Sequence, residues 1–319
     1  MTAVPNKTAI ITGASAGLGL ECARALLATD PSWHIVFAVR DLARGTQAVA
    51  QAGDPARCTV LQMDLASLMS VHAFVDDFRG RNLPPLHAIV CNAGLQVVSG
   101  IERTAEGVEM TFGVNHLGHF ALVQDLRAEL VAPARIVVVA SGTHDPAKTT
   151  GMPSPQYTSA ADLAHPSDDE PVDGRRRYTT SKLCNVLYAY ELDRRLGQGA
   201  QGVTVNAFDP GLMPGSGLAR DYSAIGRWTW RYVFPLLRVL PNVNSVRSSG
   251  ERLAALVSDP GFDGVTGTYF EGKRPIRSSA DSYDREKALD LWVTSEQLLT
   301  LQTAEHQDQH REPRSRPAK

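Results

Sequence analysis

The sequence lacks both a long apolar run and an excess of one charge. Its 319 residues include 32 lysines and arginines and 34 aspartates and glutamates, so the side-chain charges nearly cancel. Balanced charge gives no reason to expect nucleic acid or an anionic membrane as the main partner. The apolar stretch at 232–240 is too short to span a membrane and is broken by Pro235 and Arg238. We therefore expect a small hydrophobic molecule as the main partner, with peripheral membrane contact left open.

Cysteine is scarce and shows no pattern. The four cysteines stand at positions 22, 58, 91 and 184, without a CxxC pair or metal-ligand spacing, and no signal-peptide pattern opens the chain. We expect reduced thiols and a cytoplasmic protein. There is no internal repeat, and a chain of this length with 43% apolar residues can bury one large core. The sequence therefore predicts a single domain, as a monomer or a homodimer.

Short β-branched runs alternate with helical patterns along the first part of the chain. Apolar residues between the runs fall at helical spacing, as at Leu18, Cys22 and Leu26. The runs cover residues 9–12, 35–39, 59–61, 88–91, 136–139, 203–208 and 268–271. Such alternation is typical of βαβ units. The sequence predicts an α/β fold, a single doubly wound Rossmann domain with a mostly parallel sheet of about seven strands.

Three segments depart from this alternation. Residues 143–177 are rich in Pro, Ser, Asp and Gly, which predicts an extended loop after the fifth strand. Residues 212–241 are rich in aromatic residues, Leu and Arg, and we expect one or two short helices that form a substrate lid. Residues 306–319 are polar and contain proline, which predicts a disordered tail after a domain spanning 1–305.

A glycine-rich loop joins the first strand to the first helix. Its sequence is Thr12-Gly13-Ala-Ser-Ala-Gly17-Leu-Gly19. In this context glycines let the backbone approach a pyrophosphate, and the helix N-terminus offers unpaired N–H groups. The alternative is an ordinary tight turn between a strand and a helix. The candidate cofactor-binding residues of the loop are Gly13, Ser15, Gly17, Leu18 and Gly19.

The ends of the second and third strands bear on the choice of cofactor. Arg40 follows the second strand, where a cation favours the 2′-phosphate of NADPH, although Asp41 beside it keeps NADH as the alternative. Asp64 and Leu65 end the third strand, and the carboxylate of Asp64 is placed to accept a hydrogen bond from the adenine amino group. Asp64 is also suited to cap the following helix. We expect NADPH as the cofactor.

Tyr178 precedes Lys182 by one turn of a predicted helix. A phenol has a pKa near 10, and a neighbouring positive charge lowers it toward neutral pH. The pair therefore suits proton transfer to a carbonyl oxygen that receives a hydride. The alternative is a solvated helix face on which the two residues are merely neighbours.

The order of these motifs resembles that of the short-chain dehydrogenase/reductase family, over roughly residues 5–275. Within it the chain is similar to light-dependent protochlorophyllide oxidoreductases and retinol-dehydrogenase-like reductases, and it departs from the former at Leu212, where they carry a cysteine. Asp209 replaces an aromatic residue common in the family. The motifs that carry the resemblance are the glycine loop, Asn92-Ala-Gly94, Val114-Asn-His-Leu-Gly-His-Phe120, Ser141, Tyr178-Thr-Thr-Ser-Lys-Leu-Cys-Asn185, Pro210-Gly211 and Lys287-Ala-Leu-Asp-Leu-Trp292.

The resemblance implies a role for each catalytic candidate. Tyr178 is expected to donate the proton, Lys182 to bind the nicotinamide ribose, and Asn115 to hold a water near Lys182. Ser141 is expected to polarise the carbonyl, with Thr143 as an alternative. Further residues implied in cofactor binding are Asn92, Ala93, Gly94, Tyr178, Lys182, Pro210 and Gly211. The stretch between Ser141 and Tyr178 is longer than in ordinary members of the family.

Other polar residues near these motifs receive no catalytic role. His116 and His119 are three residues apart on a helix, but they lack nearby acidic or cysteine ligands, so we expect no metal site. Cys184 is expected to be a buried structural thiol. His144 and Asp209 stand near the expected active site, and the sequence assigns neither a function.

The aromatic segment at 227–234 bears on the substrate. It suits a large apolar substrate or a contact with lipid headgroups, and equally a dimer interface or core packing. We expect an NADPH-dependent oxidoreductase that acts on a bulky hydrophobic carbonyl or alcohol. The alternatives are reduction of a ring double bond, as in protochlorophyllide reductases, and an NADPH-sensing binding protein without turnover. The set of Asn115, Ser141, Tyr178 and Lys182 argues against a pure sensor.

Overall fold

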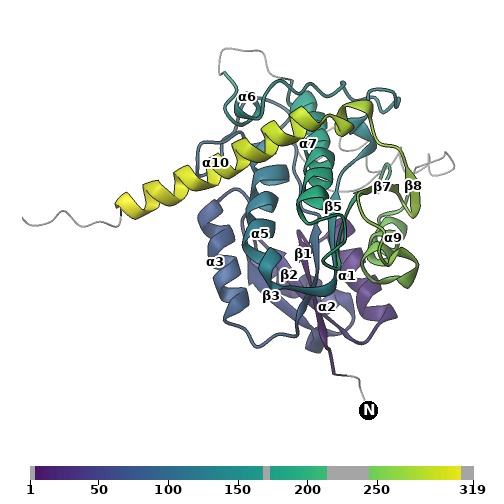
Figure 1. The fold of residues 1–319 in the computed structure, drawn as a ribbon. Helices are drawn as coiled ribbons and strands as arrows, with labels where there is room; N and C mark the ends of the chain where they lie inside the picture. The colour runs from purple at the N-terminus through teal and green to yellow at the C-terminus, as the bar shows by residue number, and fades with distance from the viewer. Residues whose placement is uncertain (1–3, 168–172, 214–243, 310–319) are drawn as a thin grey trace, which may run out of the picture.

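Eight strands form one sheet in the order β3-β2-β1-β4-β5-β6-β7-β8 (Figure 1). The computed structural model describes residues 4–167, 173–213 and 244–309, with side chains up to Leu301. Neighbouring strands are parallel except for β7 and β8, which are antiparallel. The strands are β1 (Lys7–Thr12), β2 (Trp33–Val39), β3 (Cys58–Gln62), β4 (Leu86–Cys91), β5 (Leu130–Val139), β6 (Val203–Asp209), β7 (Thr268–Glu271) and β8 (Arg274–Ile276).

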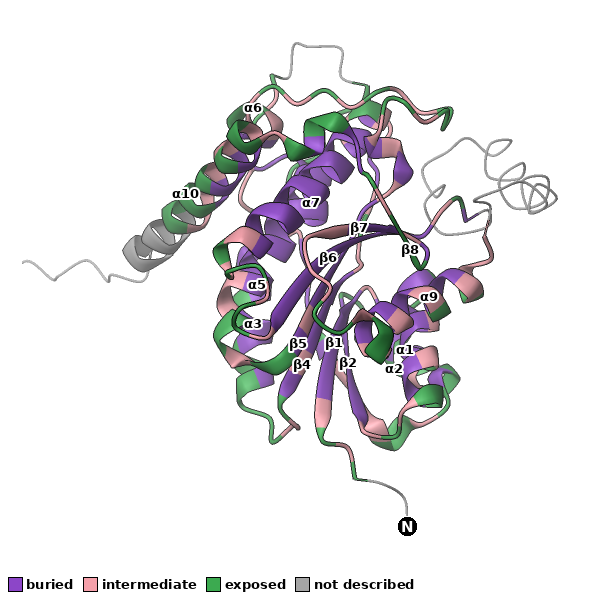
Figure 2. Ribbon diagram, turned by 45° about the vertical axis from the view of Figure 1, so that its right-hand side comes forward, coloured by how far each residue is buried: buried purple, intermediate pink, exposed green. Residues whose placement is uncertain are grey.

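Helices cover both faces of the sheet, so its central strands are buried on both sides (Figure 2). One face packs against α1 (Gly17–Thr29), α2 (Leu42–Ala52) and α9 (Val246–Ser258), and the other against α3 (Leu68–Arg79), α5 (Gly118–Leu126) and α7 (Gly174–Arg195). The last helix, α10 (Arg285–Gln309), packs on α5 and α7 through Trp292. Successive strand residues alternate between the two cores, as Ile10 and Ile11 do. This explains the nearly continuous apolar runs of the strands.

The predicted doubly wound α/β fold is confirmed, and all seven predicted strands are present. The sequence did not reveal β8, which has three residues and contains Pro275. A strand this short shows no alternation, and its pairing with β7 at the sheet edge is a long-range feature. In the described ranges, no helix combines the length and the apolar character needed to cross a bilayer.

The predicted loop at 143–177 is more structured than expected. It contains the short helix α6 (Ala160–Ala164), where Ser159 Oγ accepts a hydrogen bond from Asp162 N at 3.1 Å. Its last four residues are already helical, because Asp173 caps α7 by accepting a hydrogen bond from Arg175 N at 2.9 Å. The extended-loop prediction is therefore corrected at its C-terminal end.

Two other predicted segments are only partly described. Of the predicted lid at 212–241, the structure describes Leu212 and Met213, and the aromatic segment at 227–234 lies outside the described residues. The tail predicted from position 306 overlaps α10, which continues to Gln309. The residues around this point include good helix formers such as Ala304 and Glu305, which the polar composition concealed.

The parallel strands bring the motif residues to one edge of the sheet. The carboxyl ends of β1, β4, β5 and β6 lead directly into the glycine loop, Asn92, the turn at Ser141, and Pro210. The strand order reverses between β1 and β4: the chain continues from β1 to β2 on one side and from β4 to β5 on the other. In doubly wound sheets, ligands bind in the crevice outside such a switch point.

Candidate active site

The glycine loop has the backbone that its glycines permit. Gly13 and Gly17 have φ angles of 65° and 60°, in the left-handed region that other residues seldom adopt. A Cβ at Gly13 would lie 3.0 Å from Ala93 Cα, so the loop also packs closely on the turn after β4. A Cβ at Gly17 would meet no atom within 4 Å, so open space adjoins the loop at the start of α1.

The N-terminus of α1 has no side-chain cap, since its N-cap residue is Ala16. Side chains do cap α2, α3, α7 and α9, through Asp41, Ser67, Asp173 and Ser245. The first N–H groups of a helix need an acceptor, and a phosphate group is well suited to supply it. The residues at this end of the sheet therefore fit the pyrophosphate of a dinucleotide.

The predicted adenosine end is formed by the residues after β2 and β3. Arg40 is exposed, and its carbonyl accepts a hydrogen bond from Gln62 Nε2 at 3.3 Å. Asp64 Oδ1 accepts a hydrogen bond from Ala66 N at 3.0 Å. The idea that Asp64 also caps the next helix is wrong, because Ser67 caps α3. Leu65 is buried, and its backbone packs closely on Gly118 of α5, since a Cβ at Gly118 would lie 2.7 Å from the Leu65 carbonyl oxygen.

Thr12 ties the end of β1 to the turn after β4. Its Oγ1 accepts hydrogen bonds from Asn92 N at 2.9 Å and from Ala93 N at 2.8 Å. The side-chain amide of Asn92 donates to the carbonyl of Thr12 at 2.7 Å. The glycine loop and the Asn92-Ala-Gly94 turn are thus one hydrogen-bonded unit.

Asn115 links that turn to α7, the helix that carries Tyr178 and Lys182. It lies in a π-helical turn, Gly113–Leu117, inside the α4 (Met110–Phe112) to α5 segment. Its Oδ1 accepts a hydrogen bond from Leu95 N at 2.8 Å, and its Nδ2 donates to Leu95 O at 3.0 Å and to Ser181 Oγ at 2.9 Å. π-Turns are frequent at functional sites. Asn115 therefore lies in a distorted helical turn and also forms hydrogen bonds to the turn after β4 and to α7. The water expected beside it stays a prediction.

Tyr178 and Lys182 lie one turn apart on α7, 6% and 4% exposed. Lys182 Nζ donates to Val139 O at 3.1 Å and lies 5.7 Å from the centre of the Tyr178 ring. Burial lowers the pKa of Lys182 to about 8, and the negative charge of Asp209 acts in the opposite direction. A protonated Lys182 near neutral pH supplies the positive charge that the phenol requires.

Ser141 caps a 3-10 turn, Gly142–His144, directly after β5. Its Oγ accepts a hydrogen bond from Thr143 N at 3.3 Å, whereas the buried Thr143 Oγ1 has no hydrogen-bond partner among the described residues. His144 Nδ1 donates to Ser141 O at 2.7 Å, and its Nε2 accepts from Ser279 N at 3.1 Å. Burial lowers the pKa of His144, which fits its neutral form. His144 therefore holds the turn of Ser141 and Thr143 in place.

Asp209 is a buried carboxylate at the start of the Pro210-Gly211 turn. Its Oδ1 accepts a hydrogen bond from Gly211 N at 2.9 Å, and its Oδ2 accepts one from Tyr269 OH at 3.1 Å. Lys148 Nζ lies 3.8 Å from Asp209 Oδ2 and 2.8 Å from Glu271 Oε1. These ion pairs fasten the segment after β5 to the ends of β6 and β7. Lys148 could not be predicted from sequence, because its partners Asp209 and Glu271 lie far along the chain.

His116 and His119 are both buried but have different partners. His116 Nε2 lies 2.8 Å from Ser295 Oγ, and His119 Nε2 lies 2.8 Å from Thr12 Oγ1. Burial lowers their pKa values to about 3 and about 4, respectively. Throughout the part of the chain that the structure describes, no three metal-binding side chains come together. The spacing of the two histidines did not predict Ser295 and Thr12 as their partners, because both lie far away in the sequence.

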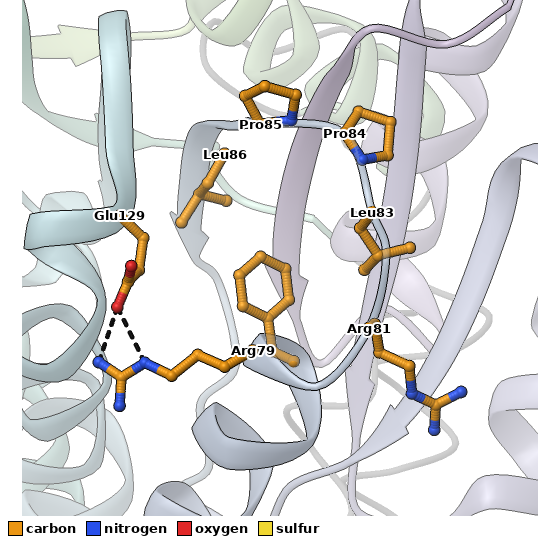
Figure 3. A pocket seen from close by; sticks show the side chains of 8 residues that line it. Arg79, Arg81, Leu83, Pro84, Pro85, Leu86 and Glu129 are labelled. Carbon is orange, nitrogen blue, oxygen red and sulfur yellow. Dashed lines mark hydrogen bonds and ion pairs between the residues drawn. The ribbon is translucent and has the colours of Figure 1, made fainter.

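A pocket lies at the opposite edge of the sheet from these motifs (Figure 3). It adjoins Leu86, the first residue of β4, and Arg79, the last residue of α3. Arg79 Nη2 forms an ion pair with Glu129 Oε1 at 2.7 Å. None of the predicted site residues lines this pocket, so it is separate from the candidate active site.

Comparison with known proteins agrees with this geometry. Residues 7–159 match the family model described as short chain dehydrogenase. The chain is 36% identical to a protochlorophyllide reductase from Avena sativa, over 92% of this chain and 99% of that protein. It is 33% identical to the WW domain-containing oxidoreductase of Homo sapiens, over 92% of this chain and 68% of that protein.

Solved structures show the same fold. An uncharacterized protein from Mycobacterium paratuberculosis is 27% identical with a TM-score of 0.68, covering 93% of this chain and 94% of that chain. A blue fluorescent protein from a metagenomic library, in complex with NADPH, is 23% identical with a TM-score of 0.61, covering 84% and 97%. The chain is therefore an oxidoreductase of the short-chain dehydrogenase/reductase family, similar to protochlorophyllide reductases.

Proposed function

We propose that the protein transfers a hydride between NADPH and a bulky hydrophobic carbonyl or alcohol. One observation carries the proposal: the buried ammonium of Lys182 lies beside both Tyr178 and the turn after β4. Its Nζ is 5.7 Å from the centre of the Tyr178 ring, and a Cβ at Gly94 would lie 3.6 Å from it. A positive charge close to both Tyr178 and the turn after β4 supports proton donation by Tyr178 beside a bound nicotinamide.

The residues suit carbonyl reduction and its reverse. A bound nicotinamide supplies or accepts the hydride. When a carbonyl carbon gains the hydride, its oxygen gains negative charge and takes the proton of Tyr178, and in alcohol oxidation Tyr178 takes the proton back. Lys182 favours the ionised phenol, and a hydroxyl of Ser141 or Thr143 fixes and polarises the oxygen.

The cofactor assignment rests on the uncapped α1 and on Arg40. The helix N-terminus suits the pyrophosphate, and the exposed guanidinium after β2 suits a 2′-phosphate. Asp41 is engaged as the cap of α2, accepting a hydrogen bond from Arg44 N at 3.1 Å. That hydrogen bond involves only one oxygen of the Asp41 carboxylate, so the preference for NADPH over NADH rests on the guanidinium of Arg40.

A substrate screen tests this proposal. NADPH oxidation is followed spectrophotometrically with retinoids, steroids, quinones and aliphatic aldehydes, and alcohols are tried with NADP⁺. We expect turnover with at least one bulky apolar compound and none with the Tyr178→Phe variant. Turnover that is equal in both proteins would rule out Tyr178 as the proton donor.

Reduction of a ring double bond in protochlorophyllide is the second candidate function. The 36% identity to the Avena sativa reductase favours it. Leu212, which is 39% exposed, argues against it, because those enzymes are expected to carry a cysteine there. Adding protochlorophyllide and NADPH in the dark and then illuminating the sample separates the two functions. Consumption of the pigment only in the light would establish the second.

A further inference from the structure

His119 is buried on the helical segment that also carries Asn115, and its ring faces the glycine loop. It lies on α5, and its two ring nitrogens face partners from different parts of the chain. Nε2 is 2.8 Å from Thr12 Oγ1, and Nδ1 is 3.2 Å from the carbonyl oxygen of Asn115. Thr12 directly precedes Gly13, so the ring joins the predicted catalytic and cofactor-binding segments.

The partners of His119 determine where its proton lies. A backbone carbonyl only accepts hydrogen bonds, so Nδ1 carries the hydrogen and donates it to Asn115. Burial lowers the pKa of His119 to about 4, although the hydrogen bond to the Asn115 backbone raises it, and the charge of Lys182 lowers it by a smaller amount. The ring is therefore neutral near pH 7. In a neutral imidazole the other nitrogen is an acceptor. The hydroxyl of Thr12 is therefore the donor to Nε2.

This assignment accounts for every hydrogen-bonding position of the Thr12 hydroxyl. A hydroxyl has one donor and two acceptor positions. The hydrogen is directed at His119, and the two lone pairs accept from Asn92 N and Ala93 N at 2.9 and 2.8 Å. The alternative acceptor, Val90 O, lies 3.4 Å away, which makes it much the poorer partner. His119 thus fixes the rotation of the hydroxyl that supports both amides.

The turn supported by Thr12 has little freedom to move. A Cβ at Gly13 would lie 3.0 Å from Ala93 Cα, and one at Gly19 would lie 2.6 Å from Asn92 Nδ2. Because these segments touch, a shift of the Asn92-Ala-Gly94 turn displaces the glycine loop as well. A displacement of about 1 Å at such a site is enough to reduce binding or turnover strongly.

We propose that His119 is a positioning residue for the cofactor: by accepting the hydroxyl hydrogen of Thr12, it locks the glycine loop to the turn after β4. This inference rests on the proposed NADPH-dependent function. His119 touches neither cofactor nor substrate in this account. It acts through Thr12, and its loss weakens NADPH binding even where the domain stays folded.

The chain contains a matched control in His116. This histidine is also buried, lies one turn earlier, and has its pKa lowered in the same way, but its Nε2 lies against Ser295 of α10. His116→Phe and His119→Phe therefore make the same chemical change at similar depth. Only the second removes the acceptor of Thr12.

The test measures NADPH affinity by fluorescence titration and folding by thermal denaturation. We expect His119→Phe to weaken NADPH binding about tenfold, the effect of losing one good buried hydrogen bond. Thr12→Val should weaken it more, because it also removes the acceptor of Asn92 N and Ala93 N. The double variant should bind NADPH no more weakly than Thr12→Val alone, because Thr12→Val already removes the bond to His119. His116→Phe should keep wild-type affinity even if its melting temperature falls equally.

His119→Gln is the rescue variant. The glutamine carbonyl can stand near the place of Nε2 and again accept from Thr12, so this variant should bind NADPH more tightly than His119→Phe. If His119→Phe does not fold, His119→Gln and Thr12→Val still make the comparison. Equal affinities of His119→Phe and His116→Phe would overturn the inference, as would a glutamine variant no better than phenylalanine. Failure of the wild-type protein to bind NADPH would instead overturn the proposed function.

Discussion

Asn115 Nδ2 donates a hydrogen bond to Ser181 Oγ at 2.9 Å, and Ser181 Oγ donates to the carbonyl of Tyr178 at 2.7 Å. The π-helical turn is thereby connected to the backbone of the proposed proton donor through one hydroxyl. Ser181 lies between Tyr178 and Lys182 on α7, and the sequence patterns assigned it no catalytic role. This link makes the position of α7 depend on Asn115.

Removing the Ser181 hydroxyl should misplace Tyr178. Ser181→Ala leaves a buried N–H of Asn115 without a partner, at a cost of about 1–3 kcal/mol, and we expect kcat to fall about 10- to 100-fold. Thr179→Val is the control, because Thr179 Oγ1 donates to Arg176 O at 3.0 Å in the same way without contacting Asn115. Steady-state kinetics decide, and equal kcat values for the two variants would contradict the role of Ser181.

The Arg40 side chain should discriminate between the two nicotinamide cofactors. Replacing Arg40 with Ala removes the exposed cation after β2, so the KM for NADPH should rise about tenfold or more while the KM for NADH changes little. Parallel titrations with both cofactors measure this. Equal changes for NADPH and NADH would show that Arg40 does not bind the 2′-phosphate.

The charge of Asp209 should affect the pH dependence of turnover. Lys182 has its pKa lowered by burial to about 8 and raised by Asp209, so the free enzyme should lose kcat/KM as pH rises through this region. Asp209→Asn removes the effect that raises the pKa, and the decline should begin at lower pH. Glu271→Gln is the control, since Glu271 also pairs with Lys148. A pH profile of Asp209→Asn that overlays the control would contradict this account.

The two buried histidines should make the fold sensitive to acid. Burial lowers the pKa of His116 from 6.5 to about 3 and that of His119 to about 4. Between these values and pH 6.5, both histidines are protonated in the unfolded chain and neutral in the folded chain. The free energy of unfolding is therefore not reduced by these histidines above pH 6.5, and it falls as the pH drops toward 4. Denaturant unfolding measured between these pH values should show a shallower pH dependence for His116→Phe. An unchanged slope would mean that His116 does not titrate in this way.

Local sequence patterns predicted the strands and most of the candidate site residues. In a parallel sheet the carboxyl ends of neighbouring strands lie at the same edge, so residues that follow these strands come close together. Once the strands were recognised, Gly13, Asn92, Ser141 and Gly211 had to meet at one edge, since each follows the carboxyl end of a neighbouring strand. Helical spacing was enough to place Tyr178 and Lys182 on one helix.

The contacts that support the site did not follow from local patterns. His119 meets Thr12 across 107 positions of the sequence, and Lys148 meets Glu271 across 123. Such pairs depend on tertiary packing rather than on periodicity or turn chemistry. The same applies to β8, whose three residues are recognisable as a strand only through their pairing with β7.

Proton donation by Tyr178 is tested by the Tyr178→Phe variant. It keeps the ring and removes the hydroxyl, so NADPH titration and single-turnover hydride transfer can be compared with the wild-type protein on one substrate. We expect NADPH affinity near that of the wild type and a loss of turnover of about 100-fold or more, as when a general acid is removed. Turnover close to that of the wild type, with NADPH still bound, would contradict this role of Tyr178.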